Sequence, residues 1–378
     1  MGLFSRLKLV ENSDEPDPKI TAQYAPPVMV GNYYSFNDAF GFQDTQVDLP
    51  SALSVPSVMK CRNLICGVLG GLPLHLFKKS TGQRLASPVW LEQPDERQPR
   101  SVTISFTTQS LIFNGVAYWE VLSVYSDDGR PARFAWVANE RVTVKYNQKN
   151  TEIIGYQVDG ILRPMNGVSS LITFQSLNPA VLLSGARTIR AALDIQRASA
   201  IAAATPIPSG HIKNSGADLP ESVVQSLLAS WKAARTSRAT AYLTSTLDYI
   251  PTQFSPKDMM YIEAIQSQST EIARLMGVPA YMLSSDANKS MTYQNVLEAR
   301  KEFYAYTLAP YVCAIEDRLS MNDITNAANS VRFAVDETFL RANATDRLAV
   351  IEKMLSLGLI TLEQALEMEN LSPNGGSY

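Results

Sequence analysis

Residues 276–319 constrain the fold more than any other stretch, because two helices have to be separated there at fixed points. An apolar stripe at helical spacing runs up to Met276, where Gly277 supplies a left-handed cap and Pro279 prevents continuation. A polar segment follows, and Thr292 can cap a very long second helix that reaches Leu319. The local chemistry therefore predicts a helix, a short connection and a second helix.

The second of these helices carries a proline in its interior. Pro310 removes one backbone hydrogen bond and crowds the carbonyl of Tyr306, at a cost of about 3 kcal/mol. We therefore expect a kink at this proline. The apolar side of the helix is formed by large residues, namely Val296, Phe303, Tyr311, Ile315 and Leu319.

The preceding part of the chain mixes helices with strands, which predicts an α+β fold. We expect helices over residues 54–69 and about 101–113. Strands are expected over residues 72–78, 116–122, 133–137, 142–146, 153–158 and 161–165, with Asp159-Gly160 as the hairpin turn between the last two. Residues 11–50 are proline-rich and predict an extended arm with little core of its own.

From Gly185 onward the pattern changes. We expect an Ala-rich helix over 185–205, then a small mixed region with a strand at 209–213, a helix at 220–234 and a strand at 241–244. Ser255 and Pro256 begin the helix that ends at Met276. A last strand at 331–336 precedes two short helices, 343–357 and 361–369, the second with a Thr361/Gln364 capping box.

Composition narrows the classes of function. The 378 residues carry a formal net charge of -3, whereas a protein that grips nucleic acid statically usually has a strong basic excess. Either DNA is not a partner, or the contact is loose. The odd count and wide spacing of the cysteines (Cys61, Cys66, Cys313) argue against a disulfide framework, and Cys61 and Cys66, five apart without a second pair, argue against zinc.

No catalytic motif was found. The sequence has no P-loop, no Gly-x-Ser-x-Gly elbow and no His-Glu-x-x-His, so we expect neither an enzyme nor a bound cofactor or metal. His75 is expected to be a packed or edge residue of a strand, and His211 to have a structural role. The acidic pairs Asp127-Asp128 and Asp95-Glu96 are more typical of solvated turns than of metal ligands.

Three groups of charged or polar residues remain as candidate sites. Arg187, Arg190, Asp194 and Arg197 share one face of the Ala-rich helix, either as a solvated face or as charges that bridge neighbouring subunits. The loop 284–290, with Ser285, Asn288, Lys289 and Ser290, is either a surface connector or a mobile finger. The basic cluster Lys232, Arg235 and Arg238 fits solubility or docking equally well.

Four stretches resemble the shorter class of tailed-phage portal proteins. They are residues 58–76, ending in Gly-Gly-Leu-Pro-Leu-His-Leu; Phe-Asn-Gly-Val-Ala-Tyr at 113–118, where the family usually has Gly-Asn-Ala-Tyr; the blocks 273–279, 303–310 and 315–319; and residues 347–373. The resemblance covers most of residues 54–373 and depends on order and spacing. The chain departs from the family at residues 183–186, where a Gly-x-Ser-Pro-Leu motif is common.

The resemblance implies a dodecameric ring at one capsid vertex and a set of named parts. They are an N-terminal arm (1–50), an α+β wing (51–184), a stem helix (185–205), a clip (206–254), a second stem helix (255–277), a tunnel loop with a kinked helix (278–320), a wing return strand (321–342), and a small helical crown with a disordered tail (343–378).

The same resemblance implies the partners. The ring would conduct double-stranded DNA weakly and without sequence preference during packaging and ejection. It would dock the large subunit of terminase and the head–tail connector or adaptor proteins, and contact the major capsid protein or scaffold. It would assemble in the host cytoplasm and remain in the virion, without a membrane. The alternatives are another capsid or DNA-binding structural protein and, less readily, an unrecognised hydrolase.

Overall fold

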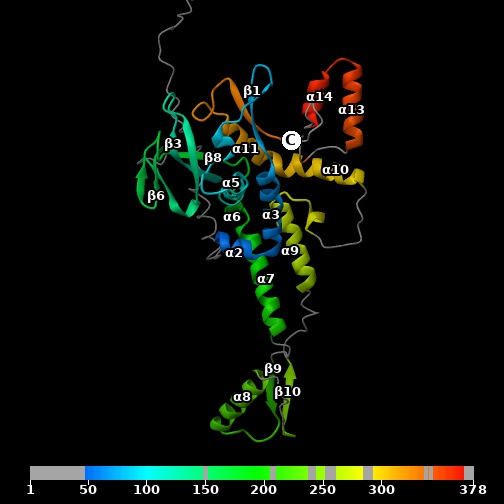
Figure 1. Ribbon diagram of the computed structural model, residues 1–378. Coiled ribbons are helices and arrows are strands. Elements are labelled where there is room, and N and C mark those ends of the chain that lie inside the picture. Colours follow the sequence, from blue (N-terminus) through cyan, green and yellow to red (C-terminus); the bar gives the residue numbers. More distant parts are fainter. Residues whose placement is uncertain are drawn as a thin grey trace, which may run out of the picture.

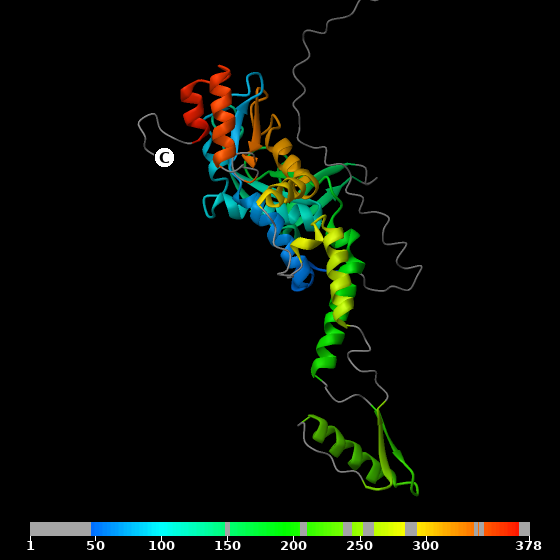
Figure 2. The same cartoon turned by 90° about the vertical axis from the view of Figure 1, so that its right-hand side faces the viewer.

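The computed structural model describes residues 47–147, 152–204, 210–236, 244–251, 261–283, 293–335, 339 and 344–369. It confirms the α+β class. Figure 1 shows a body of helices and strands, from which α7 (Ala186–Ala204) and α9 (Tyr261–Leu275) project, with a smaller unit beyond their far ends. The view turned by 90° shows the same two helices side by side (Figure 2).

Two helices begin the described chain where the sequence predicted one. α2 (Leu49–Ser54) is capped by Asp48, and α3 (Pro56–Gly71) follows after a break at Val55. The break has a local cause, because the residue before a proline is pushed out of the helical region and Val55 has an extended backbone. Since α2 begins at Leu49, the predicted arm is shorter than residues 11–50, and residues 1–46 lie outside the described part.

The strands of the body form three small antiparallel sheets, which include two strands that the sequence did not predict, Arg84–Leu85 and Leu171–Gln175. The first has the order β4-β3-β8, made of Pro131–Val137, Val116–Val124 and Leu171–Gln175. The second has the order β5-β6-β7, made of Val142–Tyr146, Ile153–Val158 and Ile161–Arg163. Asp159 (φ 53°) and Gly160 (φ 79°) are both left-handed, which confirms the predicted tight hairpin between β6 and β7.

The first sheet packs on α5 (Arg100–Asn114) through Trp119. This side chain is fully buried, and its indole Nε1–H donates to Thr107 Oγ1 at 2.7 Å. The rings of Phe134 and Phe174 lie 5.2 Å and 4.8 Å from it. A buried Trp requires a partner for its N–H, and the hydroxyl on α5 fixes how the helix lies on the sheet.

The third sheet pairs strands that come from the early and the late part of the body's sequence. Its order is β11-β1-β2, with strands Asn329–Phe333, Leu74–Lys78 and Arg84–Leu85, and Leu74 pairs with Phe333. His75 is buried on the central strand, so it is a packed residue and not an edge residue. A single core cluster extends from α3 and α5 across this sheet to α11 (Ala309–Leu319).

The small unit beyond α7 and α9 consists of β9 (Gly210–Asn214), α8 (Glu221–Thr236) and β10 (Leu247–Pro251). The two strands pair only with each other, and Trp231 of α8 lies 5.2 Å from Tyr249 of β10. Among the side chains described in this unit, none is buried. The final strand was predicted at 241–244, but Thr244 is outside the strand and β10 begins at Leu247; residues 241–243 are not described.

Two short helices end the described chain, α13 (Ala344–Ser356) and α14 (Leu362–Met368). The capping box is confirmed, because Thr361 N–H donates to Gln364 Oε1 at 2.9 Å and Gln364 N–H donates to Thr361 Oγ1 at 3.3 Å. Within the described part of the chain, no helix is both long enough and apolar enough to cross a membrane.

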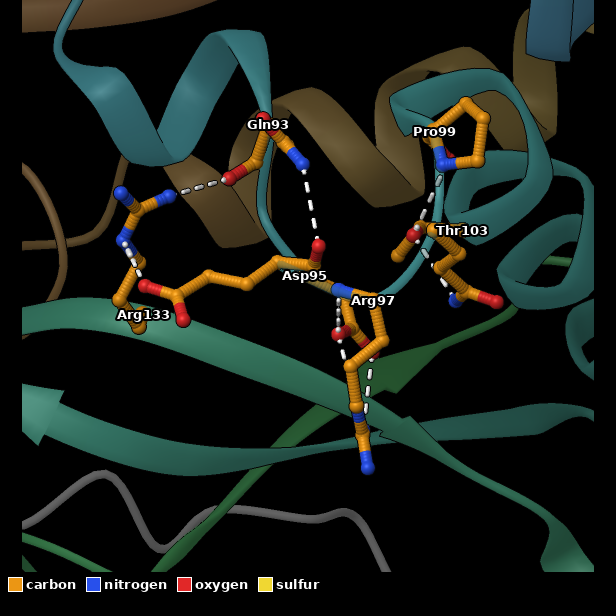
Figure 3. A network of polar contacts seen from close by, with 8 residues as sticks. Gln93, Asp95, Arg97, Pro99, Thr103 and Arg133 are labelled. Carbon is orange, nitrogen blue, oxygen red and sulfur yellow. Dashed lines mark hydrogen bonds and ion pairs between the residues drawn. The ribbon is translucent and has the colours of Figure 1, made fainter.

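The prediction that Asp95-Glu96 is a solvated turn was wrong for Asp95, which is only 2% exposed. Figure 3 shows Arg97 folded back onto it: the Arg97 backbone N–H and Nε both donate to Asp95 Oδ1, at 2.9 and 3.0 Å, and Nη2 donates to Oδ2 at 3.0 Å. Glu96 points the other way and pairs with Arg133 of β4 at 3.2 Å. The turn therefore ties α4 (Val89–Glu92) to the sheet.

Asp95 is held ionised by this arrangement. Burial opposes the charge, but the hydrogen bonds and the positive charge of Arg97 outweigh it, so the pKa of Asp95 lies below its usual value. A carboxyl with a depressed folded-state pKa contributes stability above its unfolded pKa, and the contribution disappears as the pH falls through the folded value.

We therefore predict that Arg97→Met destabilises the body by about 1–2 kcal/mol at pH 7, because a buried carboxylate loses its charged partner. The penalty should shrink as the pH falls below about 4, where Asp95 protonates in the unfolded chain. Urea unfolding at several pH values measures both effects. Arg141→Met, which breaks the exposed Arg141–Asp159 pair, is the control and should change stability by less than about 0.5 kcal/mol. A pH-independent penalty for Arg97→Met would contradict this account.

Candidate functional site

The end of α9 is closed as the sequence predicts. Gly277 has φ +66°, its N–H donates to the carbonyl of Arg274 at 3.2 Å, and the N–H of Val278 donates to that of Ala273 at 2.9 Å. These two bonds form a Schellman motif, in which a left-handed residue satisfies the last carbonyls of a helix. Pro279 then begins the short 3-10 turn Ala280–Met282.

The long helix around Pro310 is interrupted by a π-helical turn. α10 (Tyr293–Phe303) continues into the π turn Tyr304–Leu308, and α11 starts at Ala309 with Pro310 in its first turn. Ala309 N–H reaches back to the carbonyl of Tyr304, one residue further than in an α-helix. The wider turn places the proline where its missing donor matters least. The sequence predicts a kink at Pro310, and the structure shows a π-helical turn directly before this proline.

The π turn is joined to the end of α9 by one hydrogen bond. The hydroxyl of Thr307 donates to the carbonyl of Gly277, and Thr307 is 2% exposed. An added Cβ at Gly277 would lie 3.9 Å from the carbonyl oxygen of Tyr306, so the two backbones are close neighbours. Leu308, the next residue, is fully buried in the core.

The predicted loop between these helices lies outside the described residues. This applies to Ser285, Asn288, Lys289 and Ser290, and to the predicted cap Thr292. The structure describes the two sides from which the loop leaves, up to Leu283 and from Tyr293 onward.

α11 is fixed to the body by a buried charge. Arg318 is 9% exposed, and its Nη1 and Nη2 donate to the two carboxylate oxygens of Asp323 at 2.9 and 2.7 Å, while its Nε donates to the carbonyl of Thr173 on β8 at 3.0 Å. The planar guanidinium matches a carboxylate in this two-bond geometry. Glu316 on the same helix accepts the Phe333 N–H of β11 at 2.6 Å, and burial raises the pKa of Glu316 above its usual value.

The charged stripe on α7 is exposed along its length. Arg187, Arg190, Asp194 and Arg197 are all exposed, while Ile189 and Ala192 of the same helix are buried. Arg190 Nε and Asp194 Oδ1 are 3.8 Å apart, which is a loose pair on a solvated face of this single chain. α9 packs along α7, and Leu275 approaches Gly185 so closely that an added Cβ would meet its Cδ2 at 2.2 Å.

The basic cluster on the small unit is described only in part. Lys232 is exposed on α8, whereas the side chain of Arg235 and the whole of Arg238 lie outside the described residues. The structure therefore shows a basic residue on this unit but leaves the cluster as a prediction.

The part of the chain that the structure describes holds no candidate metal site. Among those residues there is no group of three or more His, Cys, Asp or Glu side chains that can hold a metal ion. The hydroxyl of Ser57 on α3 lies 2.7 Å from that of Ser269 on α9. The described surfaces suit packing and assembly.

The sequence model of the phage portal protein family matches residues 56–370. The chain belongs to the phage portal protein family. This is a family of structural proteins. The match includes α3 at one end and α14 at the other, so both the body and the projecting helices belong to the region that the family shares.

Known proteins similar to this portal chain agree with the assignment. The probable portal protein of Streptomyces phage phiC31 is 23% identical over 349 residues, which cover 85% of this chain and 76% of the relative. A crystal structure of an HK97 family phage portal protein from Corynebacterium diphtheriae is similar with a TM-score of 0.62 at 21% identity, over 76% of this chain and 94% of that one. A chain in the neck of a native gene transfer agent particle, computed with C12 symmetry, is similar with a TM-score of 0.55 at 20% identity, over 88% and 94%.

The portal fold explains which residues sequence reasoning missed. Thr307 and Arg318 contact partners 30 and 145 residues away in the sequence, so no local spacing marks them. Arg318 lies within the block 315–319 that resembles the family, but its role depends on the packing of α11 against β8. An arginine two residues after Asp95 is the local signal for their ion pair, but the burial of Asp95 depends on tertiary packing.

Proposed function

We propose that this portal chain forms a dodecameric ring at one vertex of a phage-type capsid and conducts double-stranded DNA during packaging and ejection. The observation that carries the proposal is the family match together with the likeness to a chain in a particle neck of C12 symmetry. A ring of identical subunits requires head-to-tail interfaces whose rotation closes. This function needs no catalytic group of its own.

The proposed parts follow the order of the elements. The body from α3 to β8 is the wing, α7 and α9 are the stem, and β9, α8 and β10 are the clip. The exposed apolar side chains on this clip unit support its role as an assembly or docking part, since Val223 is 47% and Leu228 is 52% exposed. α13 and α14 are the crown, and β11 is the return strand of the wing.

DNA contact is assigned to the loop 284–290, with Ser285, Asn288, Lys289 and Ser290 facing the channel. A conduit must not hold the DNA tightly, because each neutralised phosphate adds affinity and salt dependence. A net charge of -3 and a single lysine in this loop fit loose contact without sequence preference. Lys232, Arg235 and Arg238 are proposed to dock the terminase motor and, later, connector proteins.

The first test is the mass of the assembled protein. Native mass spectrometry of the purified chain should show a species near twelve times 41.6 kDa. A monomer that persists at high concentration would count against the ring.

The loop is tested by Lys289→Ala. Because one lysine contributes only a weak phosphate contact, rings should assemble normally while DNA packaging or retention changes. The measurement is ring yield beside the amount of DNA per particle. If assembly collapses instead, the loop has a structural role and the assignment fails.

The stripe on α7 is tested by Asp194→Ala. If Asp194 pairs with an arginine of the neighbouring subunit, the salt concentration that dissociates the ring should fall, since screened ion pairs in every interface lose a partner. Asp128→Ala removes a carboxylate, also exposed, from the turn between β3 and β4, and should leave dissociation unchanged. If both variants dissociate at the same salt concentration, the stripe on α7 is a solvated face and not a contact between subunits.

A further inference from the structure

The chain makes a long excursion between Gly277 and Thr307, and the two ends of that excursion are bonded to each other. Thr307 donates its hydroxyl to the Gly277 carbonyl across 30 residues of sequence. Gly277 is the last residue of the α9 cap, and Thr307 lies in the π turn before α11. The bond therefore closes the base of the excursion that contains the loop 284–290.

Both partners are held rigidly on the side of the body. Gly277 is fixed by the two Schellman bonds, while Leu308 is fully buried and Tyr311 is 3% exposed. Thr307 is 2% exposed, whereas Gly277 is exposed, so the loss of the hydroxyl would remove the net contribution of one hydrogen bond and leave the Gly277 carbonyl to water. A serine could supply the same hydroxyl, whereas valine has the shape of threonine without the donor.

The described residues of the excursion pack against the body at its two ends. In α10 the described side chains from Leu297 to Glu302 are exposed or half-buried, and Phe303 is the first that is fully packed. Phe303 lies 6.4 Å from the ring of Phe339, and Arg300 lies 6.0 Å from the same ring. On the other side, Val278 is 3% exposed, and Met282 and Leu283 pack against the main core. The direction of α10 is therefore set mainly at its C-terminal end.

We propose that Thr307 is a positioning residue, and that its bond to Gly277 clamps the two sides of the excursion so that α10 and the segment Val278–Leu283 are held as one base. The π turn before Pro310 presents this hydroxyl to the end of α9. The proposal rests on the proposed function only in the statement that the excursion faces DNA.

The clamp is tested by amide hydrogen–deuterium exchange of the full chain with Thr307→Val and Thr307→Ser. With valine, exchange in Val278–Leu283 and in Leu297–Phe303 should accelerate about tenfold, because local opening no longer breaks a hydrogen bond. With serine, both segments should exchange at close to the wild-type rate. Thr108→Val is the matched control, because Thr108 is also fully buried and donates to a helix carbonyl, that of Ile104 at 2.8 Å, far from the clamp.

Three outcomes overturn the clamp. They are wild-type exchange in Thr307→Val, exchange in Thr307→Ser as fast as in the valine variant, and the same acceleration of the two segments in Thr108→Val. If Thr307→Val does not fold, amide exchange of the wild-type protein tests the clamp. The two segments should open together and show similar protection. Protection that differs about a hundredfold between them contradicts the proposal that they are held together.

Measurements on assembled particles test the clamp and the proposed DNA conduit separately. Thr307→Val should give rings in normal yield that carry less DNA per particle, and Thr307→Ser should restore it. If native mass spectrometry of the wild-type protein detects no ring, the proposed function is contradicted, whereas the exchange result for the clamp is unaffected. Normal DNA per particle in Thr307→Val, with rings formed, defeats the positioning role alone.

Discussion

The burial of α11 is the constraint on which the rest of the structure depends. Tyr311, Ile315 and Leu319 lie inside the main core, and each such side chain contributes about 1.5–3 kcal/mol by leaving water. Arg318 adds a buried, fully bonded charge between α11, β8 and Asp323. α11 follows β8 by more than 130 residues. Because α11 is buried in the body beside β8, the chain between these two elements leaves the body and returns to it at fixed points.

This constraint produces the elongated form in Figures 1 and 2. The chain leaves the body at α7 and returns through α9, and the two helices support each other by close approach, as at Gly185 and Leu275. The unit at their far end has no buried side chain among those described, and a two-stranded sheet with one helix is marginal by itself. A subunit of this form is completed by its neighbours, which fits the ring that we propose.

Local chemistry made part of the structure predictable from the sequence. The cap at Gly277, the Asp159-Gly160 hairpin and the Thr361/Gln364 capping box all depend on residues within a few positions, and all were found. Pro310 predicts a kink in the helix. The observed form is a π turn that begins six residues before the proline, and it depends on how Leu308 and Tyr311 pack.

The parts that were missed depend on contacts across the chain. The strand that pairs with β9 is Leu247–Pro251, which local composition did not mark and where an edge strand tolerates the proline. Asp95 is buried by tertiary packing that a turn sequence does not reveal. Of the candidate sites, the sequence located the exposed stripe on α7, whereas the partner of Thr307 could be found only from the fold.

The central claim is that this fold is one subunit of a closed ring whose stem helices stand side by side. Electron cryomicroscopy of the assembled wild-type protein tests it most directly. The account predicts a closed ring of twelve subunits, with α7 of one subunit beside a stem helix of the next and the excursion between Gly277 and Thr307 directed toward the axis. An open or unclosed assembly, or a ring in which this excursion faces outward, would contradict it.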